Sequence, residues 1–135
     1  SELHAAMGMA VLPHVERIIE QRARICDAYD QALADVVVKP GLPAGVSYNY
    51  AYHPVQFRDE AEREHVLAAL ASQGIHCRRY FYPSLDELPY VVGRTCPHSR
   101  DAALRTLCLP LYPDLTPQDT DRITRALLAA LDEYR

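Results

Sequence analysis

The chain has a single lysine, Lys39, among its 135 residues, no tryptophan, and two phenylalanines. It has no block of basic residues, its formal charge is −4 and its pI is about 5.8. An acidic chain without a basic patch lacks the electrostatic footprint of a protein that binds nucleic acid or an anionic membrane. No apolar run approaches the roughly 20 residues needed to cross a bilayer. We therefore expect neither nucleic acid nor membrane among its partners.

The chain has four cysteines, and no two of them form a C-x-x-C pair: Cys26, Cys77, Cys96 and Cys108. Scattered cysteines indicate free thiols in a reducing compartment, so we expect a cytoplasmic protein. The less favoured alternative is a metal site assembled from His76-Cys77 and Cys96-Pro97-His98. Because these spacings match no usual zinc motif, we predict that the chain holds no metal.

The scarcity of lysine also limits covalent catalysis. Chemistry that needs a Schiff-base lysine must use Lys39 or a lysine from elsewhere. The sequence has no Gly-rich phosphate loop, no H-E-x-x-H motif and no Ser/His/Asp arrangement. From the residues alone, the chain does not read as a self-sufficient enzyme, and we assign no catalytic residue.

The apolar pattern predicts helices that alternate with short extended segments. Helices are expected over 1–12, 14–33, 59–74, 96–105 and from 116 onward, and strands or extended segments over 36–38, 46–57, 75–82 and 106–112. This order predicts one domain, 1–135, of the α+β class or a two-layer α/β sandwich, with a small sheet covered by helices.

Several residues mark where these helices bury a face or end. In the second helix the predicted buried stripe is Val15, Ile18, Ile19, Arg22 (by its stem), Ile25, Tyr29 and Leu33. Asp59 is expected to cap the third helix with Glu62 as its reciprocal partner, and Gly74 to end it. Thr116 is expected to cap the last helix, whose buried side would be Ile123, Leu127 and Leu131.

Two polar-aromatic groups could contribute to a binding site. Arg78 and Arg79 stand beside three aromatic residues, and such a cluster can pair with phosphate and stack on a base or sugar. An edge strand with solvated arginines is the alternative, and composition alone favours it. If 46–57 is a strand, Tyr48, Tyr50 and Tyr52 share one face and His53 points the other way. Packing of that face on a helix is favoured over a cleft wall.

Four segments carry motif-like sequences in a fixed order: S-E-L-H-A-A-M-G at 1–8, G-I-H-C-R-R-Y-F-Y-P at 74–83, C-P-H-S at 96–99 and L-C-L-P-L-Y-P-D-L-T at 107–116. They resemble the S-E-L-Q-A-A-x-G, G-I-x-x-R-x-Y-F-x-P, C-P-x-A and L-x-L-P-L-Y-P-x-L-T motifs of the DegT–StrS sugar-nucleotide aminotransferases, which use pyridoxal phosphate (PLP). The R-Y-F-Y-P form is similar to that of members acting on dTDP-linked deoxysugars. The resemblance runs along essentially the whole chain.

The resemblance implies that the chain is the C-terminal small domain of such a fold-type I aminotransferase, which acts on a keto-sugar nucleotide in deoxyamino-sugar or polysaccharide biosynthesis. Helix 1–34 would link it to a large catalytic domain upstream of Ser1. That domain would supply the PLP-binding lysine, since Lys39 matches no family motif. We therefore expect this chain alone to bind no PLP and to be inactive, with the large domain or a homodimer partner completing the enzyme.

The resemblance also implies substrate-binding residues. In the family, the segment matching 79–82 lies near the sugar nucleotide. Tyr80 is expected to donate its hydroxyl to the substrate, Arg79 to bind a phosphate, and Tyr82 to lie beside them. The rival interpretation is a free-standing binding or interaction module that kept the fold and lost the chemistry. In both cases we expect an exposed apolar interaction surface on the first helix, around Ala5, Ala6, Met9 and Ala10.

Overall fold

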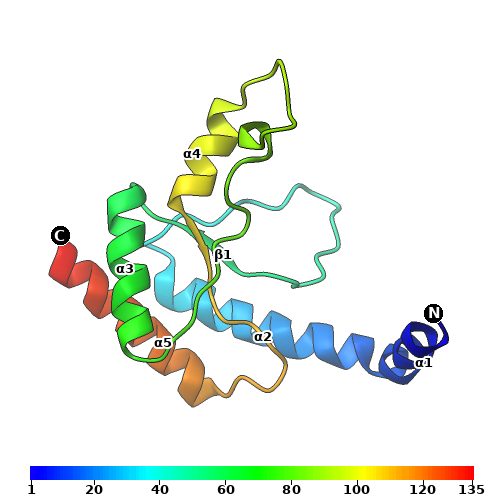
Figure 1. The fold of residues 1–135 in the computed structure, drawn as a ribbon. Helices are drawn as coiled ribbons and strands as arrows, with labels where there is room; N and C mark the ends of the chain where they lie inside the picture. The colour runs from blue at the N-terminus through cyan, green and yellow to red at the C-terminus, as the bar shows by residue number, and fades with distance from the viewer.

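The computed structural model describes residues 1–135 as a helix-rich body with a small sheet (Figure 1). In chain order the elements are α1 (Glu2–Val11), the 3-10 turn η1 (Leu12–His14), α2 (Val15–Leu33), β1 (Pro54–Gln56), α3 (Glu60–Ser72), the 3-10 turn η2 (Leu85–Glu87), α4 (Pro97–Arg105), β2 (Thr106–Cys108) and α5 (Pro117–Tyr134). The five predicted helices are therefore confirmed, as is the small sheet among them.

The sheet is shorter than the sequence predicts. β1 and β2 are antiparallel, with Val55 opposite Leu107. Segments 36–38 and 75–82 each contribute only one bridge, Val38 to Gln56 and Arg78 to Cys108, so predicting strands over their full lengths was wrong. The strand predicted over 106–112 stops at Cys108, and because Pro110 has no N–H the ladder cannot continue past it.

The prediction of a strand over 46–57 was wrong for most of its length. Only Pro54–Gln56 pairs. Tyr50 has a φ of 50°, in the left-handed region, and the Ala51 N–H donates to the Asn49 side chain at 3.0 Å. The chain therefore turns where a strand would continue, and the spacing of the tyrosines does not place them on one face.

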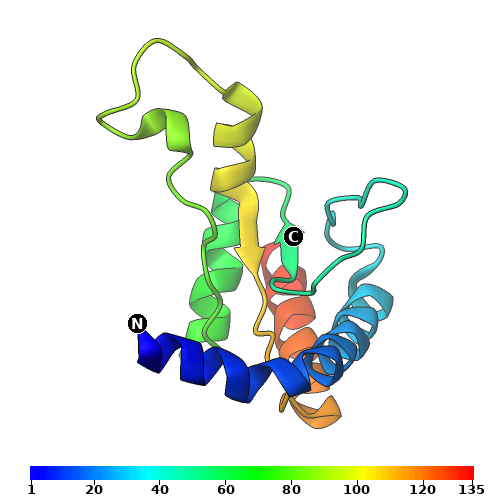
Figure 2. The same ribbon diagram turned by 90° about the vertical axis from the view of Figure 1, so that its right-hand side faces the viewer.

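Three helices and the strands share one apolar core. α3 and α5 lie side by side along the strands, and α2 crosses α5 (Figures 1 and 2). Fully buried side chains come from each of these elements: Tyr29, Val55, Val66, Leu70, Leu107, Leu127 and Leu131. Ile123, Leu127 and Leu131 form the buried side of α5 as predicted.

The buried stripe of α2 is confirmed only in its second half. Ile25, Tyr29 and Leu33 are buried, as is Cys26, whereas Val15 is exposed. The first half of α2 runs out from the body toward α1 (Figure 1), so its apolar residues have less of the core to contact.

The predicted helix caps are confirmed with one correction. Thr116 and Asp119 form a complete capping box at the start of α5, and Gly74, with a φ of +73°, follows the end of α3. Asp59 accepts the Glu62 N–H at 2.8 Å. The Glu62 carboxylate, however, does not return to Asp59: it is buried, where it accepts from the Arg58 N–H at 2.8 Å.

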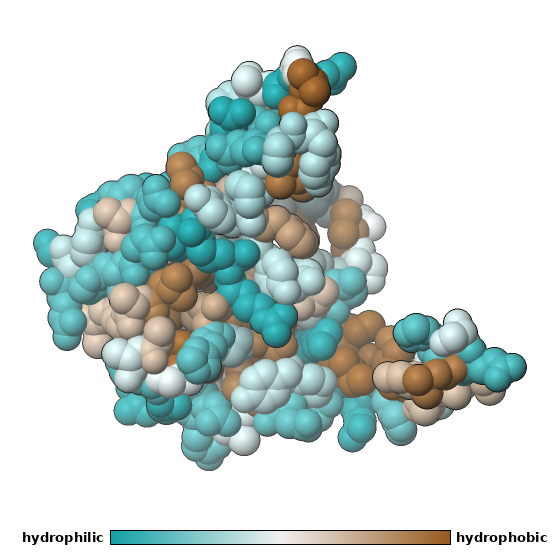
Figure 3. All heavy atoms as spheres, viewed as in Figure 1, coloured by the Kyte–Doolittle hydropathy of each residue, from teal (hydrophilic) through white to brown (hydrophobic).

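The first helix projects from the body. α1 has no buried residue, and its main contacts are with η1, where Pro13 interrupts the helical run as predicted. Its exposed side chains include Leu3, Met7 and Met9, and Figure 3 shows apolar surface on this arm. None of the helices combines the length and apolarity of a membrane span.

Candidate functional site

A cavity of about 320 Å³ opens where four segments of the chain meet. It is lined by Arg22, Ala51, Tyr52, Arg78, Tyr80, Cys108, Leu109, Pro110, Leu111 and Tyr112. Arg22 comes from α2, and residues 108–112 come from the end of β2 and the segment after it. Reciprocal backbone hydrogen bonds of 3.1 and 2.8 Å between Arg78 and Cys108 hold the 78–80 segment against that strand. The short sheet thus brings together residues that are far apart in sequence.

The cavity carries positive charge with no lining carboxylate to balance it. Its charged lining residues are Arg22 and Arg78, and neither forms an ion pair within 4.0 Å. The Arg78 guanidinium donates to the Tyr80 hydroxyl at 3.0 Å. The Nε of Arg22 is buried and has no hydrogen-bond partner. Two guanidiniums with unused donors around one cavity favour an anionic ligand.

Aromatic rings form the rest of the polar wall. The rings of the lining residues Tyr52 and Tyr80 lie 5.0 Å apart between centroids. Phe81 does not line the cavity, but its ring lies 5.1 Å from that of Tyr80 between centroids. The Arg78 guanidinium lies over the Tyr80 ring at 5.7 Å. Rings supply apolar faces and hydroxyls, so the cavity can hold a cyclic organic body that carries an anionic group.

The three predicted substrate-binding residues separate in the structure. Tyr80 lines the cavity, whereas Arg79 and Tyr82 do not. The Arg79 guanidinium lies 3.6 Å above the Tyr82 ring and faces α3, with Glu60 at 3.9 Å and Glu64 at 3.7 Å. Neighbours in an extended segment point to opposite sides, which places Arg78 and Tyr80 together and Arg79 apart. Substrate binding by these three residues stays a prediction.

The residues of the second polar-aromatic group, 48–53, also lie in different places. Tyr52 joins the cavity, while Tyr48 donates to the Tyr52 carbonyl at 2.7 Å and its ring contacts that of Tyr50. His53 is buried and lies 5.0 Å from Tyr29 between ring centroids. Sequence reasoning placed Arg22 only in a helix stripe and gave Tyr112 no role. A charged residue in an otherwise apolar stripe was the available signal for Arg22.

Lys39 lies at a different cavity. Because it is the only lysine of the chain, its position decides whether this chain could bind PLP covalently by itself. That cavity, of about 160 Å³, contains Lys39, Asp30 and His53 and shares no lining residue with the arginine cavity. The Lys39 ammonium is paired with the Asp30 carboxylate. The chain's own residues therefore do not fit covalent attachment of PLP at the arginine cavity.

The residues of the metal alternative are not gathered. All four cysteines are free, and no group of three or more His, Cys, Asp or Glu side chains is arranged to hold a metal ion. The Cys96 N–H instead donates to Asp86 at 2.7 Å. Hydrogen bonds from Ser84 and Cys96, with the Arg100 guanidinium, lower the pKa of Asp86 to about 2, so this carboxylate anchors the 84–100 segment.

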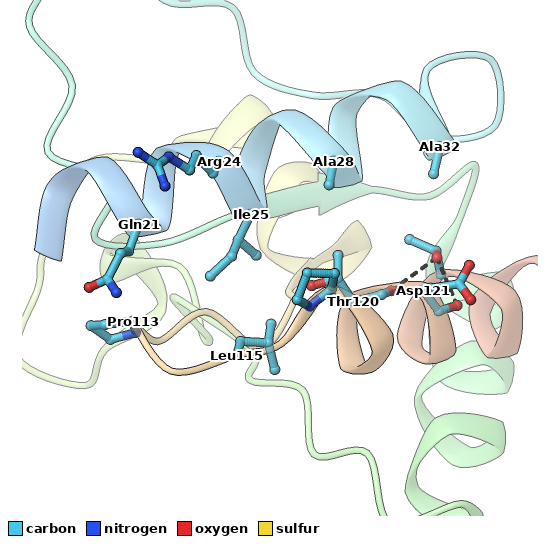
Figure 4. Close-up of a pocket in the computed structure, with 11 residues that line it drawn as sticks. Gln21, Arg24, Ile25, Ala28, Ala32, Pro113, Leu115, Thr120 and Asp121 are labelled. Carbon is cyan, nitrogen blue, oxygen red and sulfur yellow. Dashed lines mark hydrogen bonds between the residues drawn. The ribbon is translucent and has the colours of Figure 1, made fainter. Parts of the chain in front are cut away.

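A third cavity, of about 350 Å³, lies between α2 and α5 (Figure 4). In the close-up, Ile25, Ala28 and Ala32 on α2 face Leu115 and the start of α5. Its one carboxylate, on Asp121, is paired with Arg125 at 2.6 Å. This groove therefore offers apolar surface, and the arginine cavity is the better candidate for binding chemistry.

Comparisons with known proteins agree with the motifs in the sequence. The sequence model of the DegT/DnrJ/EryC1/StrS aminotransferase family matches residues 1–128. The dTDP-4-amino-4,6-dideoxy-D-glucose transaminase of Escherichia coli is 30% identical, over 97% of this chain and 38% of its own length. The chain thus spans little more than a third of the curated relatives that it matches.

Solved structures share the fold. DesI, crystallised in the presence of its TDP-sugar product, is 30% identical with a TM-score of 0.82, over 96% of this chain and 35% of DesI. The PLP form of the sugar aminotransferase Spr1654 from Streptococcus pneumoniae has a TM-score of 0.88 over 100% of this chain and 36% of its own; at 18% identity it supports the fold alone. With the family model covering nearly all its residues, this chain belongs to the DegT/DnrJ/EryC1/StrS aminotransferase family.

Proposed function

We propose that this chain is the C-terminal part of a PLP-dependent aminotransferase that transfers an amino group to a keto-sugar nucleotide. The cavity lined by Arg22, Arg78 and Tyr80 carries the proposal, because its cations and rings suit a sugar joined to phosphate. The names of the relatives agree: the E. coli protein is a dTDP-sugar transaminase, and DesI was crystallised with a TDP-sugar.

The remaining two thirds of such an enzyme would supply the chemistry that this chain lacks. PLP serves as the electron sink in transamination and needs a lysine to hold it. Lys39 is paired with Asp30 away from the cavity, so an upstream domain must provide the amine. On this proposal the 135 residues alone are inactive, and the cavity binds and orients substrate in a cytoplasmic enzyme.

The exposed first helix supports a docking role for residues 1–34. α1 presents Leu3, Met7 and Met9 to solvent, and exposed apolar surface of this kind marks an interaction site. We propose that the upstream domain, or the partner subunit of a homodimer, covers it. A free-standing interaction module is the second candidate, because the same arm would serve it equally. The two differ in whether a catalytic portion precedes Ser1 in the natural protein.

Tyr80 provides the direct test of the cavity. In the complete enzyme, Tyr80→Phe should raise KM for the sugar nucleotide or lower kcat, with a combined loss in kcat/KM of about tenfold. The variant keeps the ring and removes the hydroxyl that accepts from Arg78 at 3.0 Å. Steady-state transamination of a keto-sugar nucleotide measures the effect.

The exposed Tyr90 provides a matched control, since it lies outside the cavity and Tyr90→Phe should leave both constants unchanged. Equal kinetics for Tyr80→Phe and the wild type would remove Tyr80 from the site. Absence of transamination in the wild-type complete protein, reconstituted with PLP, would reject the proposed function itself.

A further inference from the structure

We infer that Arg22 and Arg78 form an oxyanion subsite within the cavity, with Arg22 as the less exposed of the two. Binding of an oxyanion here needs only this chain. The assignment of that anion to a substrate of the aminotransferase rests on the proposed function.

Arg22 is unusual among the arginines of this chain. The other buried or half-buried arginines all pair with a carboxylate: Arg63, Arg79, Arg100 and Arg105. Arg22 is half-buried, has no ion pair, and its Nε is buried without a hydrogen-bond acceptor. Arg63 and Arg79 also have guanidinium nitrogens without a hydrogen bond, but carboxylates within 4.0 Å balance their charge. A buried charged donor without a partner is costly, so a ligand that supplies an acceptor gains the full value of the missing bond.

Arg78, an exposed residue, lines the same cavity and supplies a second guanidinium. It donates to the Tyr80 hydroxyl, which is neutral, so its positive charge stays uncompensated. No lining residue is acidic, and the lining residues at and directly after the end of β2 are Cys108 and Leu109. Two cations without a counter-charge, beside the hydroxyls of Tyr52 and Tyr112, are suited to a ligand with several anionic oxygens.

Two parts of an aminotransferase reaction could present such oxygens. One is the diphosphate of a nucleotide-linked sugar, and the other is the carboxylate of an amino donor. Both are oxyanions that a guanidinium binds in the plane of its N–H groups. Probes of each kind therefore distinguish the source, and neither probe depends on transamination.

The test is a titration of the isotopically labelled 135-residue chain with inorganic pyrophosphate and, separately, with glutamate. Arginine Nε–Hε resonances are followed by NMR. We expect the Arg22 resonance to shift with saturation for one probe, and Arg22→Gln or Arg78→Gln to weaken that binding by about tenfold or more. Saturation by pyrophosphate assigns the subsite to phosphate, and saturation by glutamate assigns it to the donor carboxylate.

Arg17→Gln is the matched control, since Arg17 is an exposed residue of the same helix and has no ion pair. It should leave the affinity within about twofold, because exposed charges are screened by salt. Equal weakening by all three variants would show a diffuse charge effect and overturn the subsite. So would the absence of a saturable shift with both probes while the spectrum shows a folded chain. An anion-binding chain whose complete form fails to transaminate would keep the subsite and reject only the proposed function.

Discussion

Replacing Glu62 with alanine is expected to lower the free energy of unfolding by about 3 kcal/mol, measured by urea denaturation at neutral pH. The Glu62 carboxylate is fully buried, where it accepts from the Arg58 N–H at 2.8 Å and from Arg135 Nε at 2.9 Å. Burial alone would raise the pKa of Glu62, but these hydrogen bonds hold the pKa below its usual value. The variant would leave a donor at the start of α3 and the C-terminal arginine without their acceptor.

Two variants separate this effect from the loss of any acidic residue. Glu133, which is exposed on α5 and has no ion pair, should change stability by no more than about 0.5 kcal/mol when replaced with alanine. Glu62→Gln keeps the side-chain size and an acceptor oxygen, and should fall between the two. A loss below about 1 kcal/mol for Glu62→Ala would contradict this role of the buried carboxylate.

Acidification is expected to remove about 3 kcal/mol of stability through His53 alone. Burial lowers the pKa of His53 from 6.5 to about 4, although Asp30, at 3.6 Å, opposes the shift and Lys39 adds to it. Because the folded-state pKa is the lower one, the unfolded chain binds the extra proton between these values. Stability from this residue is complete above pH 6.5 and is lost as the pH falls toward 4.

Urea denaturation of the wild type and of His53→Gln, at intervals from pH 7 to pH 4, measures this contribution. The wild type should lose more stability across that window than the variant, by about 3 kcal/mol, since glutamine does not titrate. Parallel pH profiles for the two proteins would show that His53 is protonated as easily in the folded chain as in the unfolded one. Carboxylates with lowered pKa values, such as Asp86, affect both proteins equally and at lower pH.

The sequence predicts the helices well because their signals are local. Thr116 and Asp59 mark helix starts with side-chain hydrogen bonds that need only three or four neighbouring residues. The buried side of α5 follows from spacing alone. The extended segments were harder to predict, because one turn at Tyr50 and the missing N–H of Pro110 decide where pairing stops. The alternation of apolar and polar residues does not show where the backbone turns or where a ladder hydrogen bond is missing.

The candidate site depends on contacts that no single segment encodes. Tyr80 could be selected from a motif, and the structure places it at the cavity. Arg22 comes from a helix, 56 positions before Arg78 in the sequence, and the bridge between Arg78 and Cys108 holds the second arginine at the same cavity. The partnering of Arg79 with α3 likewise depends on how two segments pack.

The position of Lys39 gives the functional account its physical basis. A complete aminotransferase needs a lysine at the cofactor, and the single lysine of this chain is tied to Asp30 at another cavity. On the proposed function, the cavity of Arg22, Arg78 and Tyr80 would bind and orient the substrate, and no lysine lines it to supply the amine. This is why we propose that the chain acts as part of a larger enzyme and not alone.

The most direct measurement is the intact mass of the natural protein that contains these residues, purified from its source cells. The relatives are roughly three times longer than the matched region, so we expect a species about three times heavier than 15.2 kDa that contains these peptides. A natural species of 15.2 kDa, with no longer form, would contradict the assignment of this chain to a complete aminotransferase and would support a free-standing interaction module.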